Sequence, residues 1–310
     1  MQKSHVVRLL PLALVVFVTV AQASTPARQQ SEWLSAALAP FGFRPAKMQA
    51  LHDGRLGLTV KINAKPARLL LSVGAPLTAL DRRSSVRLGL SERPSGDWVG
   101  GPLKGPREDY GMAKVKGVEV AGVILADFDV AVMNLPSPAG DSLDGVFGTG
   151  QLMRLNAVID CRARLLYLNP KGRPKQRVPG LEGVFASHGY TRIPLTINGN
   201  RHFEASCAVN GRPSKIIIEP AAVDTIIMRA LARNAHIPWS DSGYRALTVA
   251  GGSARLDFGV AQTLSIGSFQ ATGAQISVLD ATFNTLGIDF LRSHNAVIDT
   301  GGMNLYLRPR

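Results

Sequence analysis

The sequence is poor in aromatic residues, in cysteine and in paired histidines. Aromatic residues make up 6% of the 310 positions, and no basic stretch alternates with them. A nucleic-acid-binding surface is therefore not expected, although the formal net charge is +13. The six histidines are scattered, with no pair at helical or zinc-ligand spacing. We predict neither a metal site nor a cofactor.

Only two cysteines are present, Cys161 and Cys207. If the protein is exported, an oxidising compartment would permit a disulfide between them. Such a bond would join the two halves of the chain and would stabilise the fold by ~4 kcal/mol on the chain-entropy model. Two buried free thiols, acting as small apolar side chains, fit the sequence equally well. Both alternatives stay open at this point.

The first 23 residues have the three parts of a secretory signal peptide. Lys3 and Arg8 are basic, residues 9–20 are apolar, and Ala21-Gln22-Ala23 offers small residues for cleavage. The apolar run is too short to span a bilayer, and no later run is long enough. We therefore expect a periplasmic or secreted protein without a membrane span. Losing Lys3 and Arg8 lowers the net charge from +13 to +11, which favours attraction to an anionic envelope surface.

Two pairs of segments repeat along the chain. Residues 62–78 align without a gap to 209–225, so that Ser72 corresponds to Glu219. Residues 146–170 align in the same way to 285–309, and Asn-Ala-Val-Ile-Asp occurs in both copies, ending at Asp160 and at Asp299. The matched pairs follow the same order with similar spacing. This pattern indicates a duplicated fold unit.

The distribution of apolar alternation and of turn residues predicts a mostly β protein with one or two short helices per unit. In the extension before the first unit, Ser31 is a candidate cap for a short helix that ends at Pro40 and packs on the first unit. The predicted organisation is a signal peptide at 1–23, the extension at 24–50, lobe one at 51–170, a basic linker at 171–180 and lobe two at 181–310.

The repeated units resemble the aspartic peptidase superfamily, in particular bacterial retropepsin-like proteins. In lobe one, an apolar strand enters the small-residue loop at Gly74-Ala75, followed by a short helix at 81–88 and a hairpin region at 91–107 that corresponds to the family's flap. Residues 286–291, and more loosely 147–152, match the apolar turn that precedes the family's closing strand. The resemblance covers nearly the whole chain after residue 51. It implies two retropepsin-like lobes in a pseudo-twofold, pepsin-like bilobal barrel arrangement, within a monomer.

The resemblance also implies a catalytic site, but its residues are changed here. Each lobe of the family supplies one Asp, and the two carboxyl groups share a proton. Those positions hold Ser72 and Glu219, and the threonines that follow them in the family are replaced by Val73 and Pro220. A serine hydroxyl cannot share a titrating proton, so we do not expect ordinary aspartic proteolysis. The two loops are predicted to line a binding cleft with Ser72, Val73, Gly74, Ala75, Glu219, Pro220, Ala221 and Ala222.

Three aromatic residues, Trp98, Tyr110 and Tyr244, fall in flap-like regions and are candidates to line the same cleft. The literal Asp-Thr-Gly that begins at Asp299 is not a catalytic loop. The repeat aligns it with Asp160-Cys161-Arg162, and too few residues follow it to form a helix and a flap.

We interpret the chain as an exported pseudoprotease that binds a peptide or protein segment between its lobes. Two alternatives remain. One is an active or residual endopeptidase that uses Glu219 as a lone general base. The other is a structural or regulatory subunit that joins an envelope assembly through its outer faces and basic charge.

Overall fold

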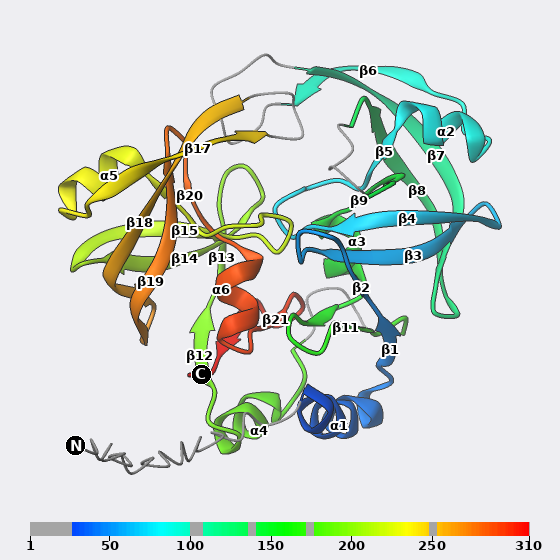
Figure 1. Cartoon of the computed structure of the whole chain (residues 1–310). Helices are drawn as coiled ribbons and strands as arrows, with labels where there is room; N and C mark the ends of the chain where they lie inside the picture. The colour runs from blue at the N-terminus through cyan, green and yellow to red at the C-terminus, as the bar shows by residue number, and fades with distance from the viewer. Residues whose placement is uncertain (1–26, 100–107, 136–140, 172–176, 248–252, 310) are drawn as a thin grey trace, which may run out of the picture.

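The computed structural model describes residues 27–99, 108–135, 141–171, 177–247 and 253–309. The predicted signal peptide and residues 172–176 of the predicted linker lie outside this range. Two β-rich lobes lie side by side above a smaller sheet to which both contribute (Figure 1). The prediction of a mostly β, bilobal acid-protease arrangement is confirmed.

Lobe one is built on an eight-stranded sheet in the order β2-β3-β4-β9-β5-β8-β7-β6, and an additional pairing of β3 with β7 curls it toward a barrel. The alternating burial of β3 matches its alternating sequence, as a half-buried strand requires. Its strands are β2 (Gln49–Ala50), β3 (Leu56–Ile62), β4 (Lys65–Leu71), β5 (Ala79–Asp81), β6 (Arg93–Val99), β7 (Glu108–Val120), β8 (Val123–Met133) and β9 (Gly145–Phe147).

Lobe two repeats this sheet strand for strand, in the order β13-β14-β15-β20-β16-β19-β18-β17, with β14 also paired to β18. The parallel pair β4–β9 of lobe one has its counterpart in β15–β20. The strands are β13 (Thr196–Ile197), β14 (Phe203–Val209), β15 (Arg212–Ile218), β16 (Ile226–Met228), β17 (Trp239–Leu247), β18 (Ser253–Ile266), β19 (Phe269–Leu279) and β20 (Asn284–Leu286).

The closing strands of both lobes, flanked by β1 and β12, form a shared six-stranded sheet in the order β1-β11-β10-β21-β22-β12. At its centre Ile159 of β10 lies opposite Ile298 of β21, and these two residues are equivalents in the repeat. The pseudo-twofold relation of the lobes therefore passes through this pair. The strands are β1 (Arg44–Lys47), β10 (Val158–Asp160), β11 (Leu165–Leu168), β12 (Thr191–Pro194), β21 (Val297–Asp299) and β22 (Asn304–Leu307).

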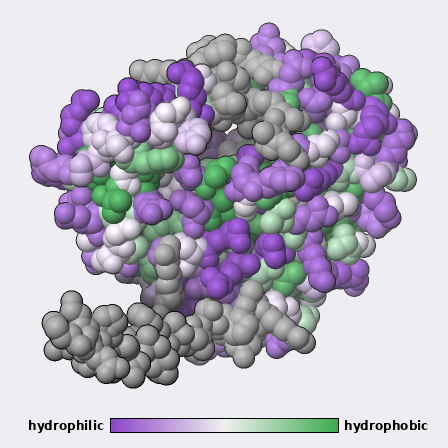
Figure 2. All heavy atoms as spheres, viewed as in Figure 1, coloured by the Kyte–Doolittle hydropathy of each residue, from purple (hydrophilic) through white to green (hydrophobic). Residues whose placement is uncertain are grey.

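The helices are short, apart from the first. They are α1 (Ala27–Leu38), the 3-10 helix η1 (Ala39–Phe41), α2 (Arg82–Arg87), α3 (Thr149–Arg154), α4 (Leu181–Ser187), α5 (Arg229–Asn234) and α6 (Ile288–Ser293). None of the helices within the described ranges has the length and apolarity needed to cross a bilayer. Hydrophilic residues cover much of the face seen in Figure 2.

The structure corrects two expectations about the first helix. Helix α1 already begins at Ala27, so Ser31 lies inside it and is not its cap. The buried side chain of Gln30 donates a hydrogen bond to Asp160 Oδ2 at 3.0 Å, and this long-range contact fixes the turn before Ser31. The helix also packs on the shared sheet and on α4, where Leu34 and Phe185 belong to one apolar cluster, and not on lobe one alone.

Of the two alternatives for the cysteines, the structure shows the free thiols and not the disulfide. Cys161 and Cys207 are both free and buried. Cys161 follows β10 in the shared sheet, whereas Cys207 lies within β14 of lobe two, and both thiols belong to the same large apolar cluster. Burial raises the pKa of both thiols, which keeps them protonated and unreactive.

Candidate functional site

The two positions aligned by the repeat meet at the junction of the lobes. Ser72 follows β4, and its N–H donates to Phe147 O at 3.1 Å. Glu219 follows β15, and its N–H donates to Leu286 O at 3.0 Å, which is the equivalent bond in lobe two. The duplicated backbone therefore delivers both side chains to the same place, one from each lobe.

Ser72 and Glu219 are joined directly by a hydrogen bond across the lobe boundary. Ser72 Oγ donates to Glu219 Oε2 at 2.7 Å, and the N–H of Gly74 donates to the same oxygen at 2.7 Å. The other carboxylate oxygen, Oε1, accepts from the N–H of Ala221 at 2.7 Å. Ser72 Oγ itself accepts from the N–H groups of Gly74 at 3.2 Å and Ala75 at 2.9 Å. The network engages both carboxylate oxygens and the hydroxyl.

The Glu219 carboxylate is enclosed by protein groups, although part of the residue's surface is accessible. Burial raises the pKa of Glu219 above its usual value, because the charged form is poorly solvated there. Hydrogen bonds from Ala221, Ser72, Gly74 and Val73 oppose the rise by favouring the charged form. The net direction is upward, so burial outweighs the donors.

The junction pairs a hydroxyl with a carboxylate. In a catalytic carboxyl pair, two close oxygens share a proton, and one carboxylate acts as base on a water bound beside both groups. Here Ser72 Oγ donates to Glu219 Oε2 at 2.7 Å, so a hydroxyl stands where such a pair has its other carboxyl group. Ser72 supplies no second titrating proton. The oxygens of Glu219 that would accept a proton are already occupied by donors.

Gly74 makes the contact between the lobes possible. A Cβ atom at this position would lie 2.1 Å from Glu219 Oε2, which is far inside contact distance. The repeat aligns Gly74 with Ala221, so lobe two carries a methyl group where lobe one must have none. The sequence indicated only that the loop needs small residues, and it did not reveal this requirement.

Three of the predicted cleft residues are buried. Val73 has no exposed surface, Ser72 is 4% exposed, and Pro220 is also buried. Burial keeps these side chains from contacting a ligand. The structure therefore corrects the prediction for these three residues. Gly74, Ala75, Ala221 and Ala222 remain partly exposed.

The predicted flaps correspond to two hairpins, β6–β7 and β17–β18, whose strands rise to the same upper side of the molecule (Figure 1). Residues 100–107 and 248–252 of these hairpins lie outside the described residues. Trp98 is 50% exposed and Tyr244 is 69% exposed, whereas Tyr110 packs on an apolar cluster of its own lobe. That Trp98 and Tyr244 line the cleft stays a prediction.

The Asp-Thr-Gly sequence has a structural role. Asp299 ends β21, which pairs with β10, and its Oδ1 accepts from the N–H of Gly302 at 2.8 Å. Asp160 in the other copy accepts from the N–H groups of Arg162 at 3.1 Å and Ala163 at 2.8 Å. Both carboxylates hold the turn that follows their own strand.

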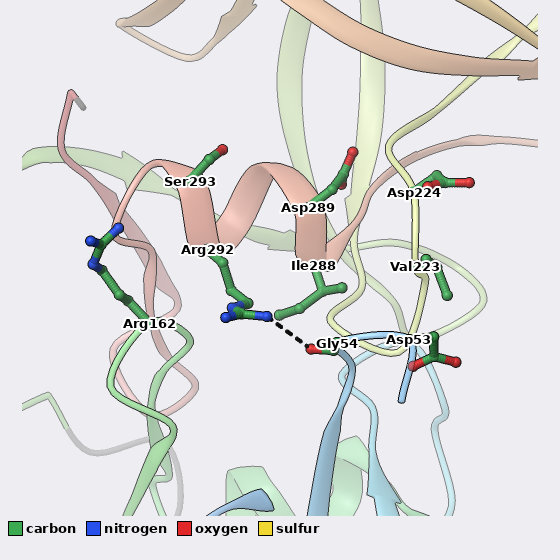
Figure 3. Close-up of a pocket in the computed structure, with 9 residues that line it drawn as sticks. All are labelled: Asp53, Gly54, Arg162, Val223, Asp224, Ile288, Asp289, Arg292 and Ser293. Atoms are coloured by element: carbon green, nitrogen blue, oxygen red, sulfur yellow. Dashed lines mark hydrogen bonds between the residues drawn. The ribbon is translucent and has the colours of Figure 1, made fainter. Parts of the chain in front are cut away.

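A second feature, an open pocket between the lobes, was not anticipated from the sequence (Figure 3). Its volume is ≈ 570 Å³, and none of its lining residues belongs to the Ser72–Glu219 network. The lining consists of Asp53, Gly54, Arg162, Val223, Asp224, Ile288, Asp289, Arg292 and Ser293. These residues come from four separate segments, so no local sequence pattern could have brought them together.

Comparison with known proteins agrees with this fold. Residues 205–293, within lobe two, match a family described as "gag-polyprotein putative aspartyl protease". Among solved structures, the basic 7S globulin from soybean superposes with a TM-score of 0.50 at 10% identity, covering 86% of this chain and 95% of its own. Conglutin gamma, a basic 7S globulin from lupine seeds, gives a TM-score of 0.51 at 11% identity, covering 87% and 95%. No curated protein matches the sequence significantly. The family match within lobe two and the shared bilobal fold show that the chain is similar to aspartic peptidase-like proteins.

Proposed function

We propose that this protein is a non-catalytic member of the superfamily that binds an extended peptide or protein segment between its lobes. The hydrogen bond between Ser72 Oγ and Glu219 Oε2 carries the proposal, because it joins the lobes where a carboxyl pair would otherwise act. The fold is kept while the groups that would activate water are engaged with one another.

The hairpins above this site support peptide binding. Strand β6 lies at the edge of the lobe-one sheet and β17 at the edge of the lobe-two sheet. An edge strand can pair with an extended peptide through main-chain hydrogen bonds, and nearby side chains then provide selectivity. Trp98 on β6 and Tyr244 on β17 are exposed aromatic residues of the kind that anchor such ligands.

The absence of catalysis is tested with the purified mature protein and unfolded casein, from acidic to neutral pH. We expect no cleavage above the rate of a buffer control. Cleavage that pepstatin blocks, or that the Glu219→Gln variant loses, would contradict the proposal and favour an active or residual endopeptidase.

Binding is tested with an array of extended peptides, followed by titration of the best peptide in solution. We expect Trp98→Ala and Tyr244→Ala each to weaken binding by roughly tenfold or more, as loss of an aromatic anchor does. Ile124→Ala is the matched control, because Ile124 is 71% exposed on β8 beside the β7–β8 turn. The proposal fails if no peptide binds, or if all three variants weaken binding equally.

We further propose that the protein acts as a monomer in the periplasm or outside the cell, with its basic surface held near anionic envelope components. The signal-like residues 1–23 and the net charge of +11 without Lys3 and Arg8 support this location. Cell fractionation at low and high salt tests it. We expect the processed protein outside the cytoplasm, with any membrane association lost at high salt. Processed protein in the cytoplasm would contradict it.

A further inference from the structure

The inter-lobe pocket of Figure 3 has a different character from the Ser72–Glu219 site. Its volume of ≈ 570 Å³ lies within the range of about 300–1,000 Å³ that is usual for small-molecule sites. Lobe one contributes Asp53 and Gly54, from the loop before β3, together with Arg162 from the β10–β11 turn. Lobe two contributes the loop after β15 and helix α6.

Two arginines lie toward one end of the pocket (Figure 3). Within the part of the chain that the structure describes, the Arg162 guanidinium makes no hydrogen bond or ion pair. Arg292 donates only a long hydrogen bond, of 3.5 Å, to Gly54 O. Most of the donors of these two guanidinium groups are therefore available to an anionic group such as a carboxylate.

Two aspartates lie on the other side of the pocket. Asp224 Oδ2 accepts from Ser277 Oγ at 3.1 Å, and Asp289 Oδ1 accepts from Thr225 Oγ1 at 2.8 Å. Burial raises the pKa of Asp289, and the nearby charge of Asp224 raises it further. Two carboxylates in this relation favour a cation between them, because it relieves their mutual repulsion.

The third acidic residue of the lining is already neutralised. Asp53 Oδ2 forms an ion pair with Arg55 at 2.6 Å, and the Arg55 side chain also donates to Ala221 O of the other lobe at 3.3 Å. Ile288 lies between the arginines and the aspartates, and Val223, which is 39% exposed, lies beside Asp224 (Figure 3). The pocket thus has a basic end, an acidic end and an apolar part.

The duplicated fold contains an internal comparison for these charges. The repeat aligns Arg162 with Gly301, Arg292 with Met153, Asp224 with Leu77 and Asp289 with Gly150. None of the four counterparts is charged. The framework of a lobe therefore does not require these charges, and a structural role common to both lobes does not explain them.

We propose that this pocket binds a zwitterionic ligand, namely a free amino acid or a short peptide with both ends uncapped. The ligand carboxylate pairs with Arg162 and Arg292, and the ligand ammonium lies against Asp224 and Asp289. Carboxylate recognition by guanidinium groups is strong because it combines charge with paired hydrogen bonds.

The proposal is tested by calorimetric titration of the mature protein with free alanine and with alanine oligomers of increasing length. Matched oligomers with an acetylated amino end or an amidated carboxyl end serve as controls. We expect one length to bind best, and each cap to weaken its binding roughly tenfold or more. Equal binding of capped and free oligomers, binding of inorganic phosphate in their place, or no binding at all would overturn the proposal.

Variants that copy the other lobe then locate the site. We expect Arg292→Met and Asp224→Leu each to reduce binding of the free oligomer by roughly tenfold or more, whereas Arg164→Gln, in the same turn as Arg162, leaves it unchanged. Arg162→Gln gives a second test if Arg292→Met does not fold, since the Arg162 guanidinium has no bond within the described structure. Unchanged binding in Asp224→Leu and Arg162→Gln would place the ligand elsewhere and refute the assignment.

Discussion

The two lobes share a backbone frame but differ at the positions that meet between them. Thr149 N donates to Ala75 O at 2.8 Å in lobe one, and Ile288 N donates to Ala222 O at 2.9 Å in lobe two. These bonds occupy equivalent places in the repeat. Where the side chains of the lobes meet, Ser72 and Glu219 are unlike and complementary, since one donates and the other accepts.

Other equivalent residues show what the frame itself requires. The hydroxyls of Thr78 and Thr225 accept from the N–H groups of Gly148 and Gly287, at 3.0 Å and 3.2 Å. A Cβ on Gly148 would lie 2.4 Å from Leu77 O, and one on Gly287 would lie 2.3 Å from Asp224 O. Each lobe therefore has a threonine that accepts from a glycine N–H, and the glycine is needed because a Cβ would collide with a backbone oxygen. These matched residues therefore serve the fold.

The largest effect is expected from giving the junction two carboxylates. Ser72→Asp places a second negative charge beside the buried Glu219 carboxylate. We expect it to lower the free energy of unfolding at neutral pH by on the order of 4 kcal/mol relative to the neutral Ser72→Asn variant. Like-charge repulsion raises one carboxyl pKa, so the loss should shrink as the pH falls through that raised value. Denaturant unfolding at several pH values measures it, and equal stability of both variants at neutral pH would contradict the geometry.

Exchanging Gly74 and its equivalent Ala221 tests whether only lobe one needs a glycine at this position. Gly74→Ala places a methyl group 2.1 Å from Glu219 Oε2 and displaces the carboxylate from its donors. We expect a loss of about 3 kcal/mol in the free energy of unfolding, as when a buried charge loses its partners. The reverse exchange, Ala221→Gly, should cost about 1 kcal/mol or less. Similar costs for the two variants would mean that the glycine is not required for the contact.

The equivalent aspartates Asp160 and Asp299 differ in their contacts, because Gln30 of α1 reaches only Asp160. Burial raises the pKa of Asp160 from 3.8 to about 6. The folded state therefore binds this proton more tightly than the unfolded state, and the stability it provides is lost as the pH rises from about 4 to about 6. In a plot of unfolding free energy against pH, this loss is a step of roughly 2–3 kcal/mol. We expect Asp160→Asn to remove that step.

The Asp160→Asn variant should fold. Gln30 Oε1 is buried without a hydrogen bond in the described structure, and it can accept from the new asparagine amide once the Gln30 side-chain amide rotates by half a turn. Asp129→Asn is the control, since Asp129 forms an exposed pair with Arg93 and should leave the step in place. A profile that is the same in wild type and Asp160→Asn would assign the step to another group.

The smallest effect is expected at Cys161, whose equivalent is Thr300. Thr300 Oγ1 donates to the carbonyl oxygens of Leu152 and Ala157 at 3.1 Å and 2.9 Å. Cys161 occupies the mirror position, and its N–H donates to Ala296 O at 3.0 Å. We expect Cys161→Thr to change the free energy of unfolding by less than about 1 kcal/mol, because carbonyl acceptors should lie within reach of the new hydroxyl. Reducing agent should not change the melting temperature, and a drop would reveal a disulfide.

Much of the fold could be predicted from the sequence because it depends on local patterns. The alternation in residues 56–62 predicted β3, and the duplicated Asn-Ala-Val-Ile-Asp predicted a repeated unit, whereas the pairing of Ile159 with Ile298 was seen only in the structure. The meeting of Ser72 and Glu219 was also implied by their equivalence in the repeat. The hydrogen bonds that join Ser72 and Glu219 could not be predicted. Whether the glutamate side chain reaches Ser72 and Gly74 depends on how closely the two lobes approach.

The sequence by itself thus determined the duplicated frame and the equivalence of Ser72 and Glu219, since both are properties of residue identity and order. Only the tertiary structure decided that Cys161 and Cys207 lie apart, that Gln30 binds Asp160, and that Arg162, Arg292 and Asp224 line one pocket. The physical reason is the same in each case. These contacts join side chains that are far apart in the chain, so they depend on the packing of the two lobes and not on any local preference.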